Sequence, residues 1–131
     1  MNERIEQFGF SPSTQNELAA LIFAGQKRAT TSLARWYGDD GLPWPVVGET
    51  WVVADGQGLP CCRCRTTHVE VRAFRSVDAA HAAAEGEEDG SLARWRAIHL
   101  AFFEQEAARD GFSFEEDALV VLEQFKMVQT L

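Results

Sequence analysis

One short stretch, residues 25–32 (GQKRATTS), brings together residue types that can do chemistry. Lys27 supplies an amine, and Thr30, Thr31 and Ser32 supply three consecutive hydroxyls. An amine beside hydroxyls can bind a phosphate or carbonyl oxygen, or can act as the base for a hydroxyl nucleophile. The same residues also suit an ordinary helix end followed by a strand. This stretch alone therefore does not decide between a catalytic and a structural role.

A second stretch, residues 85–90 (EGEEDG), gathers four carboxylates between glycines. Its structural interpretation is a solvated loop that places negative charge before a helix, where the helix dipole favours it. Its functional interpretation makes Glu85 or Glu87 a general acid or base that faces Lys27. Two of the carboxylates could instead bind a divalent cation through their oxygens.

Cationic and aromatic residues near these stretches could bind a nucleic-acid substrate. Two arginines follow Lys27, and two more alternate with cysteines along a predicted strand, which makes one face of that strand cationic. Aromatic residues around a proline-rich loop suit stacking on a base, although packing over a core edge is their more frequent use. The candidate substrate-binding residues are Arg28, Ser32, Arg35, Tyr37, Trp44, Arg63 and Arg65.

Length and composition limit the class of protein. The chain has 131 residues, which suit a single domain over residues 1–131. Its net charge of -8 opposes broad binding to long nucleic acid, including long duplex DNA. No run approaches the roughly 20 apolar residues of a membrane span, and the first residues lack a signal-peptide pattern. We expect a cytoplasmic protein with no membrane partner.

The cysteines favour a reduced strand over a metal site. Cys61, Cys62 and Cys64 lie within four residues of one another, and the chain has no second cysteine group to complete a zinc site. Cys62 and Cys64 should share one face of a partly buried strand. The sequence therefore predicts no bound metal.

The elements around residues 25–32 can be predicted from local patterns. A capping box at Thr14 to Glu17 predicts a helix that ends at Gly25 and leads directly to Lys27. Residues 28–32 should then be extended, with Thr30 and Ser32 on one side and Thr31 facing the core. Residues 33–37 suit a single helical turn.

The later elements follow in the same way. Residues 51–55 and 60–71 predict an antiparallel hairpin, and residues 76–84 predict a helix. Ser91 should cap a longer helix with one apolar stripe, on which His99 is expected to be a core histidine rather than a ligand or base. Residues 118–128 predict one or two final strands. Together these elements predict an α+β domain on a small antiparallel sheet or barrel.

The ordered set of motifs resembles the ASCH family, the activating signal cointegrator homology domain. The motifs are GlyXLysXAlaThrXSer at 25–32, ProXValGly at 45–48, AspGlyXGlyXPro at 55–60, and AlaXXGluGlyGlu at 82–87 with Trp95 and His99. The resemblance extends over residues 18–128. It implies a small PUA-like antiparallel β-barrel with flanking helices and a cleft that carries the first motif.

The resemblance also implies an RNA- or nucleoside-directed hydrolase. Some family members hydrolyse the acyl amide of N4-acetylcytidine with a Lys, a Thr and a Glu, which correspond here to Lys27, Thr30 and either Glu85 or Glu87. A Lys27 whose pKa is lowered by partial burial beside Arg28 would take the proton of Thr30, whose oxygen would attack the acyl carbonyl. Alternatively, the Glu would activate water and Thr30 would only bind the substrate. The expected partner is a nucleoside or short single-stranded RNA, and no cofactor is expected. The alternatives are a ribonuclease that cleaves single-stranded RNA, for which a divalent metal would serve, and a non-catalytic RNA-binding module.

Overall fold

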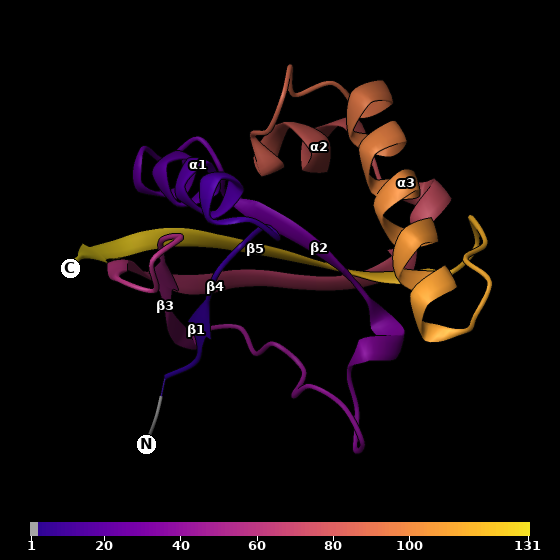
Figure 1. Ribbon diagram of the computed structural model, residues 1–131, viewed down its shortest axis with the longest axis horizontal. Helices are drawn as coiled ribbons and strands as arrows, with labels where there is room; N and C mark the ends of the chain where they lie inside the picture. Colours follow the sequence, from indigo (N-terminus) through magenta and orange to yellow (C-terminus); the bar gives the residue numbers. More distant parts are fainter. Residues whose placement is uncertain (1–2) are drawn as a thin grey trace.

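The computed structural model describes residues 3–131 and contains a five-stranded sheet against which three helices pack (Figure 1). The strands are β1 (Ile5–Glu6), β2 (Ala29–Leu33), β3 (Thr50–Ala54), β4 (Pro60–Ala73) and β5 (Leu119–Thr130). Their order in the sheet is β1-β3-β4-β5-β2. β1 pairs with β3 in parallel, whereas the other pairs are antiparallel. The α+β class is therefore confirmed.

The predicted closed antiparallel barrel is wrong. The sheet is mixed and open, with β1 and β2 at its two edges. β1 has two residues and β2 has five, so these edge strands are much shorter than β4 and β5 between them. Closing a barrel requires its first and last strands to pair along their length, and no such pairing joins β1 to β2 within residues 3–131.

The two long strands form the centre of the sheet. β4 and β5 pair from Cys62↔Thr130 to Ala73↔Leu119, with two irregularities in the register. The predicted hairpin between β3 and β4 is confirmed, and Asp55 holds its turn by accepting hydrogen bonds from the backbone amides of Gln57 and Leu59. The final segment is one strand, β5, rather than two.

Three helices pack on this sheet: α1 (Pro12–Phe23), α2 (Ala79–Glu85) and α3 (Leu92–Asp110). Ser91 caps α3 as predicted. The cap of α1 is Ser11 rather than Thr14, because Pro12 suits the first turn of a helix, where no amide hydrogen is needed. Single 3-10 turns, η1 (Ala34–Trp36) and η2 (Phe74–Ser76), follow β2 and β4.

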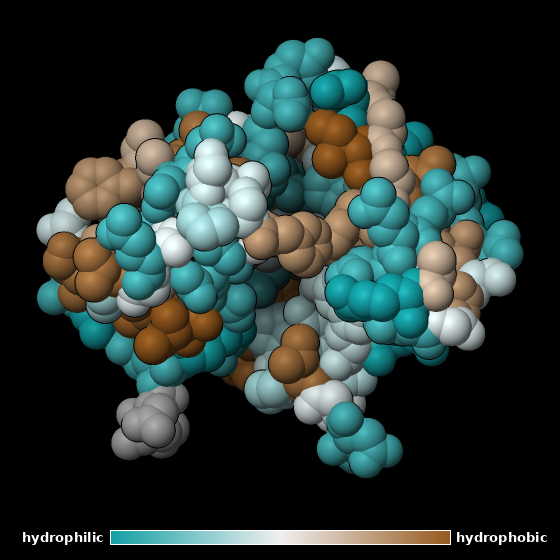
Figure 2. Space-filling view, viewed as in Figure 1, coloured by the Kyte–Doolittle hydropathy of each residue, from teal (hydrophilic) through white to brown (hydrophobic). Residues whose placement is uncertain are grey.

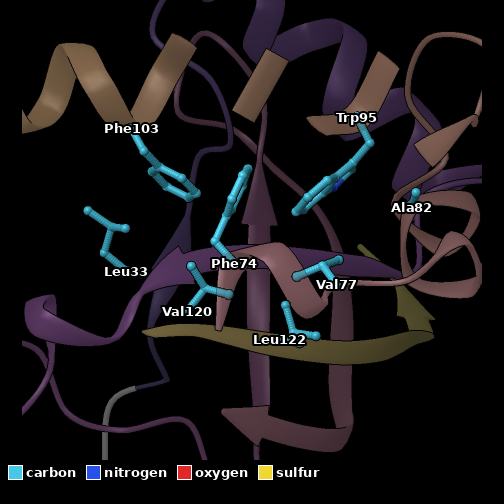
Figure 3. Close-up of a cluster of buried hydrophobic side chains, with 8 residues drawn as sticks. All are labelled: Leu33, Phe74, Val77, Ala82, Trp95, Phe103, Val120 and Leu122. Carbon is cyan, nitrogen blue, oxygen red and sulfur yellow. The ribbon is translucent and has the colours of Figure 1, made fainter. Parts of the chain in front are cut away.

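The hydrophobic core has two clusters, one on each face of the sheet. α1 covers the first cluster, which contains Ala19, Ile22, Trp51, Val53, Cys62, Cys64 and Phe125. α3 covers the second cluster, in which the ring of Phe74 lies between Trp95 and Phe103 (Figure 3). Cys62 and Cys64 are buried free thiols on one face of β4, as predicted.

Successive side chains of β2 point to opposite faces of the sheet, as in any strand. Ala29, Thr31 and Leu33 are buried, whereas Thr30 and Ser32 are half-buried on the opposite face. Leu33 belongs to the cluster under α3.

The side of the molecule seen in Figure 2 is largely hydrophilic and hollowed at its centre. No helix within residues 3–131 combines the length and the apolar character that a membrane crossing requires.

Candidate functional site

The side chain of Lys27 is buried, with an exposed fraction of 2%. The chain leaves α1 through Gly25, and the amides of Gln26 and Lys27 both bind the carbonyl oxygen of Leu21. Nζ of Lys27 donates hydrogen bonds to Ala29 O at 2.9 Å, Glu85 Oε1 at 3.2 Å and Glu87 Oε2 at 2.7 Å. A longer contact of 3.5 Å joins Nζ to the backbone oxygen of Glu85. Two carboxylates and two carbonyl groups thus hold the ammonium group.

Backbone contacts fix the acidic segment against the Lys27 segment. Gly86 ends α2 with φ 67°, and a Cβ at this position would overlap the carbonyl group of Gln26. The Gln26 side chain donates to Gly86 O at 2.9 Å, and the Arg28 amide donates to Ala84 O at 2.7 Å. Only glycine tolerates both this φ and this close approach. The spacing of Glu85 and Glu87 around Gly86 therefore brings both carboxylates to Lys27.

Glu85 is buried and receives hydrogen bonds on its second oxygen as well. Oε2 accepts from Thr31 Oγ1 at 2.6 Å and Trp95 Nε1 at 2.7 Å, and it lies 3.2 Å from His81 Nε2 and 3.5 Å from His99 Nε2. Thr31 has one hydroxyl hydrogen, which Glu85 receives, so the His81 Nε2 at 2.8 Å from Thr31 Oγ1 is a donor. These groups hold the Glu85 carboxylate in one orientation.

These contacts join the side chains that we call the Lys27 cluster: Lys27, Thr31, His81, Glu85, Glu87, Trp95 and His99. Its central pair, Lys27 and Glu85, is charged on both sides. Burial opposes the charged form of Glu85, but Lys27, His81 and His99 outweigh it and hold the pKa of Glu85 well below its ordinary value. Burial also opposes the charged form of Lys27, but Glu85 and Glu87 raise the Lys27 pKa. The predicted lowering of the Lys27 pKa is therefore wrong. Lys27 is buried as expected, but the charges of the two carboxylates outweigh burial, and the neighbouring Arg28 is exposed.

Thr30 and Ser32 face the other side of β2. Ser32 Oγ and Tyr37 OH are 2.7 Å apart, and the Tyr37 ring stacks on Trp44 with centroids 5.1 Å apart. Thr30 lies one residue after Ala29, whose carbonyl oxygen binds Nζ of Lys27. The candidate hydroxyls thus divide into Thr31, which binds Glu85, and a second group on the opposite face of the strand.

A family model described as the ASCH domain matches residues 4–129 of the chain. The chain belongs to the ASCH domain family. Two solved structures agree with this: an ASCH domain from Lactobacillus crispatus JV V101 and a protein from Enterococcus faecalis V583. The first is 39% identical with a TM-score of 0.92, covering 98% of this chain and 80% of that one. The second is 31% identical with a TM-score of 0.89, covering 100% and 83%.

No curated protein sequence matches this ASCH domain. The family and its PUA-like RNA-binding fold, both implied by the motifs, are nevertheless confirmed by the family model and the solved structures.

The remaining cationic candidates lie away from Lys27. Arg63 binds Glu3 and Gln129, and it alternates along β4 with buried Cys62 and Cys64, as Arg65 does. Arg35 lies over the ring of Phe112 at 3.5 Å. It lines a cavity of about 430 Å³ together with Trp44 near the end of β2. The structure thus separates these side chains from the Lys27 cluster, although Arg28 adjoins it in sequence.

No group of three or more His, Cys, Asp or Glu side chains within residues 3–131 has the arrangement of a metal site. Glu85 and Glu87 are instead occupied by Lys27.

Sequence reasoning did not assign Thr31, His81 or Trp95 to the site, although all three contact Glu85. Trp95 was named only as part of the family motif, and His81 was not named. Thr31 was expected to face the core, and it is indeed buried, but its hydroxyl binds Glu85. His81 precedes Glu85 by four residues on α2, a spacing that places two helical side chains on one face. That spacing was the available signal.

His99 packs on Trp95 with ring centroids 4.2 Å apart, as expected of a core histidine, and it also faces Glu85. Burial opposes its protonation, but Glu85 outweighs this and raises the His99 pKa.

The raised pKa of His99 stabilises the folded protein. This stabilisation is complete below the ordinary pKa of about 6.5 and is lost as pH rises through the raised value. We expect the free energy of unfolding of His99→Gln to fall less above pH 6.5 than that of the wild type.

Urea unfolding at a series of pH values measures this difference. His68→Gln is the matched control, because His68 is exposed on β4. The free energy of unfolding of His68→Gln should change with pH as steeply as that of the wild type. Equal slopes for His99→Gln and the wild type would contradict the predicted role of His99.

Proposed function

We propose that this ASCH domain hydrolyses the acyl amide of an N4-acylated cytidine, presented as a nucleoside or within a short single-stranded RNA. The observation that carries the proposal is the buried ion pair of Lys27 and Glu85 beside β2, with the half-buried Glu87 as a second carboxylate on Lys27. Buried ion pairs contribute little net stability, because desolvation offsets their attraction. Such groups are concentrated at functional sites.

The raised pKa of Lys27 supports one division of roles among these residues. Lys27 stays an ammonium, so it stabilises the oxyanion of the tetrahedral intermediate instead of acting as a base. Ala29 and Glu85 are its buried partners, whereas the Glu87 side chain is 32% exposed. In this scheme the acyl oxygen of the substrate takes the place of Glu87 as a hydrogen-bond acceptor of Nζ.

Glu87, once released by Lys27, is the general base. It takes a proton from the attacking water and returns it to the departing N4 amine, so that acetate and cytidine are formed. Glu85 is a positioning residue, because it is buried and its oxygens are occupied by Lys27, Thr31 and Trp95. This division selects Glu87 rather than Glu85 for proton transfer.

Thr30 binds substrate in this scheme, because Lys27 does not deprotonate it. We expect Thr30→Val to raise KM for N4-acetylcytidine by about ten-fold through loss of one hydrogen bond, while kcat stays within a few-fold of wild type. Steady-state kinetics give both constants. If Thr30→Val instead abolishes kcat at saturating substrate, Thr30 is the nucleophile and the water route is wrong.

Exposed Arg28 favours a second candidate, a ribonuclease, because the guanidinium of a residue that follows Lys27 in sequence can hold a phosphate. Cleavage of a single-stranded oligonucleotide, with and without EDTA, tests this candidate. Cleavage without any hydrolysis of N4-acetylcytidine would replace the amidohydrolase proposal. Salt-sensitive RNA binding with no turnover of either substrate would instead indicate a non-catalytic RNA-binding module.

A further inference from the structure

Glu123 is a buried carboxylate outside the Lys27 cluster, with an exposed fraction of 5%. It lies on β5 directly opposite Thr30 of β2. Side chains of directly opposed residues in an antiparallel pair share one face of the sheet. Glu123 therefore accompanies Thr30 on the face opposite Thr31.

Only one oxygen of Glu123 has partners within residues 3–131. Oε2 accepts hydrogen bonds from Thr66 Oγ1 at 2.6 Å and from Arg4 Nη2 at 2.8 Å. Thr66 is itself fixed, because it accepts from Trp51 Nε1 at 3.0 Å. Oε1 has no hydrogen bond from a described residue and is an acceptor for a ligand.

The surroundings of Glu123 are negatively charged. Arg4 also binds Glu49 Oε1 at 2.8 Å and lies 3.2 Å from Glu6 Oε1, so one guanidinium is shared among three carboxylates. Burial, together with the charges of Glu123 and Glu49, raises the pKa of Glu6 even against the effect of Arg4. An excess of acceptors of this kind disfavours an anionic ligand and favours one that presents N–H donors.

An aromatic surface lies on the same face. Tyr37 bonds to Ser32, two residues beyond Thr30, and stacks on Trp44. Burial raises the pKa of Tyr37, and the charges of Glu123 and Glu6 add to the effect, so the phenol stays a neutral donor near the carboxylates. A planar base with N–H donors at one edge matches such a combination of aromatic and acceptor groups.

We propose that Glu123 is a specificity residue, and that its Oε1 accepts a hydrogen bond from the N4–H of cytosine. The proposal takes its ligand from the proposed function, in which the substrate is an N4-acylated cytidine. Carboxylates commonly accept from the N4 amino group of cytosine. Both the acylated base and the free base keep an N4–H, whereas uracil has an acceptor, O4, at this position. Glu123 thus selects cytidine over uridine.

The variant Glu123→Gln gives a sharp test because its geometry is determined. Arg4 and Thr66 both donate to the Oε2 position, so they fix the glutamine oxygen there. The amide NH2 group must then occupy the Oε1 position, where it replaces an acceptor by a donor. The substitution should weaken cytidine binding and strengthen uridine binding.

The experiment titrates cytidine and uridine into the wild type and Glu123→Gln and measures Kd by calorimetry. The wild type should bind cytidine at least about ten-fold more tightly, and the variant should lose or reverse this ratio. Glu116→Gln, which alters an exposed glutamate, should keep the wild-type ratio. A wild type that binds both nucleosides equally, or a variant with an unchanged ratio, overturns the proposal.

A second measurement needs no variant and applies if Glu123→Gln does not fold. N4,N4-dimethylcytidine lacks the N4–H, so it should bind the wild type at least about ten-fold more weakly than N4-methylcytidine, which retains one N4–H. Equal binding of the two overturns the proposal. Selective cytidine binding without hydrolysis of N4-acetylcytidine would leave the role of Glu123 intact and remove the proposed function. Hydrolysis of N4-acetylcytidine that is unaffected by Glu123→Gln would leave the proposed function intact and remove the role of Glu123.

Discussion

Replacing Lys27 by methionine is expected to lower the free energy of unfolding by about 3–5 kcal/mol, which is the usual cost of breaking a buried ion pair by removing one partner. Methionine approximates the length of lysine, so the loss comes from charge rather than from volume. Glu85 would be left as a buried anion without its cation, although Thr31 and Trp95 would still donate to it. Urea unfolding at neutral pH measures the loss.

Two further variants separate this effect from a general sensitivity of the segment. Arg28→Met removes an exposed neighbouring cation and should change stability by no more than about 0.5 kcal/mol. The double variant Lys27→Met/Glu85→Gln removes both charges and should be more stable than Lys27→Met alone. A loss for Lys27→Met as small as that for Arg28→Met would show that the buried pair is not formed.

The second large effect is expected for Glu87→Gln, which should lower kcat for N4-acetylcytidine by about 100-fold or more through loss of the general base. The fold should persist, because Ala29 and Glu85 still bind Lys27. Steady-state kinetics with matched thermal melting curves measure both quantities. An unchanged kcat would transfer the proton-transfer role to another group.

Glu88→Gln is the control for this variant. Glu88 neighbours Glu87 in sequence, but its carboxylate is exposed and lies 3.9 Å from Arg94 on α3 instead of near Lys27. The kcat of Glu88→Gln for N4-acetylcytidine should match that of the wild type. A similar loss in both variants would indicate that the net charge of the loop, rather than Glu87 itself, supports turnover.

Local sequence patterns predicted most of the helices and the central strands. Ser91 and the apolar stripe after it defined α3, because capping and a 3.6-residue period act within one helix. The hairpin of β3 and β4 followed from two extended runs around a glycine-containing turn. The alternation of Thr30, Thr31 and Ser32 along β2 was also correct, since it depends on strand geometry alone.

Long-range pairing was not predictable in the same way. The parallel pairing of β1 with β3 involves two residues, Ile5 and Glu6, which is too short a run to give a period. Barrel closure depends on whether the edge strands meet, and the resemblance suggested closure where the sheet is open. Such contacts join residues far apart in sequence, so no local pattern reports them.

The candidate site shows the same limit. Lys27 and Glu87 were identified from residue type and motif, and they are in contact. The ionisation of Lys27 was predicted with the wrong sign, because its pKa depends on two carboxylates some sixty residues away as well as on burial. Glu123 was missed, because its significance depends on the register that places it opposite Thr30.

The most direct test of the central claim is the release of acetate from N4-acetylcytidine by the wild-type protein at neutral pH. The proposed chemistry predicts acetate and cytidine in equal amounts, formed over many turnovers per protein molecule, with the rate strongly reduced in Glu87→Gln. Acetate release no faster than in buffer alone, from protein shown by calorimetry to bind cytidine, would contradict the claim that Lys27 and Glu87 form a hydrolytic site.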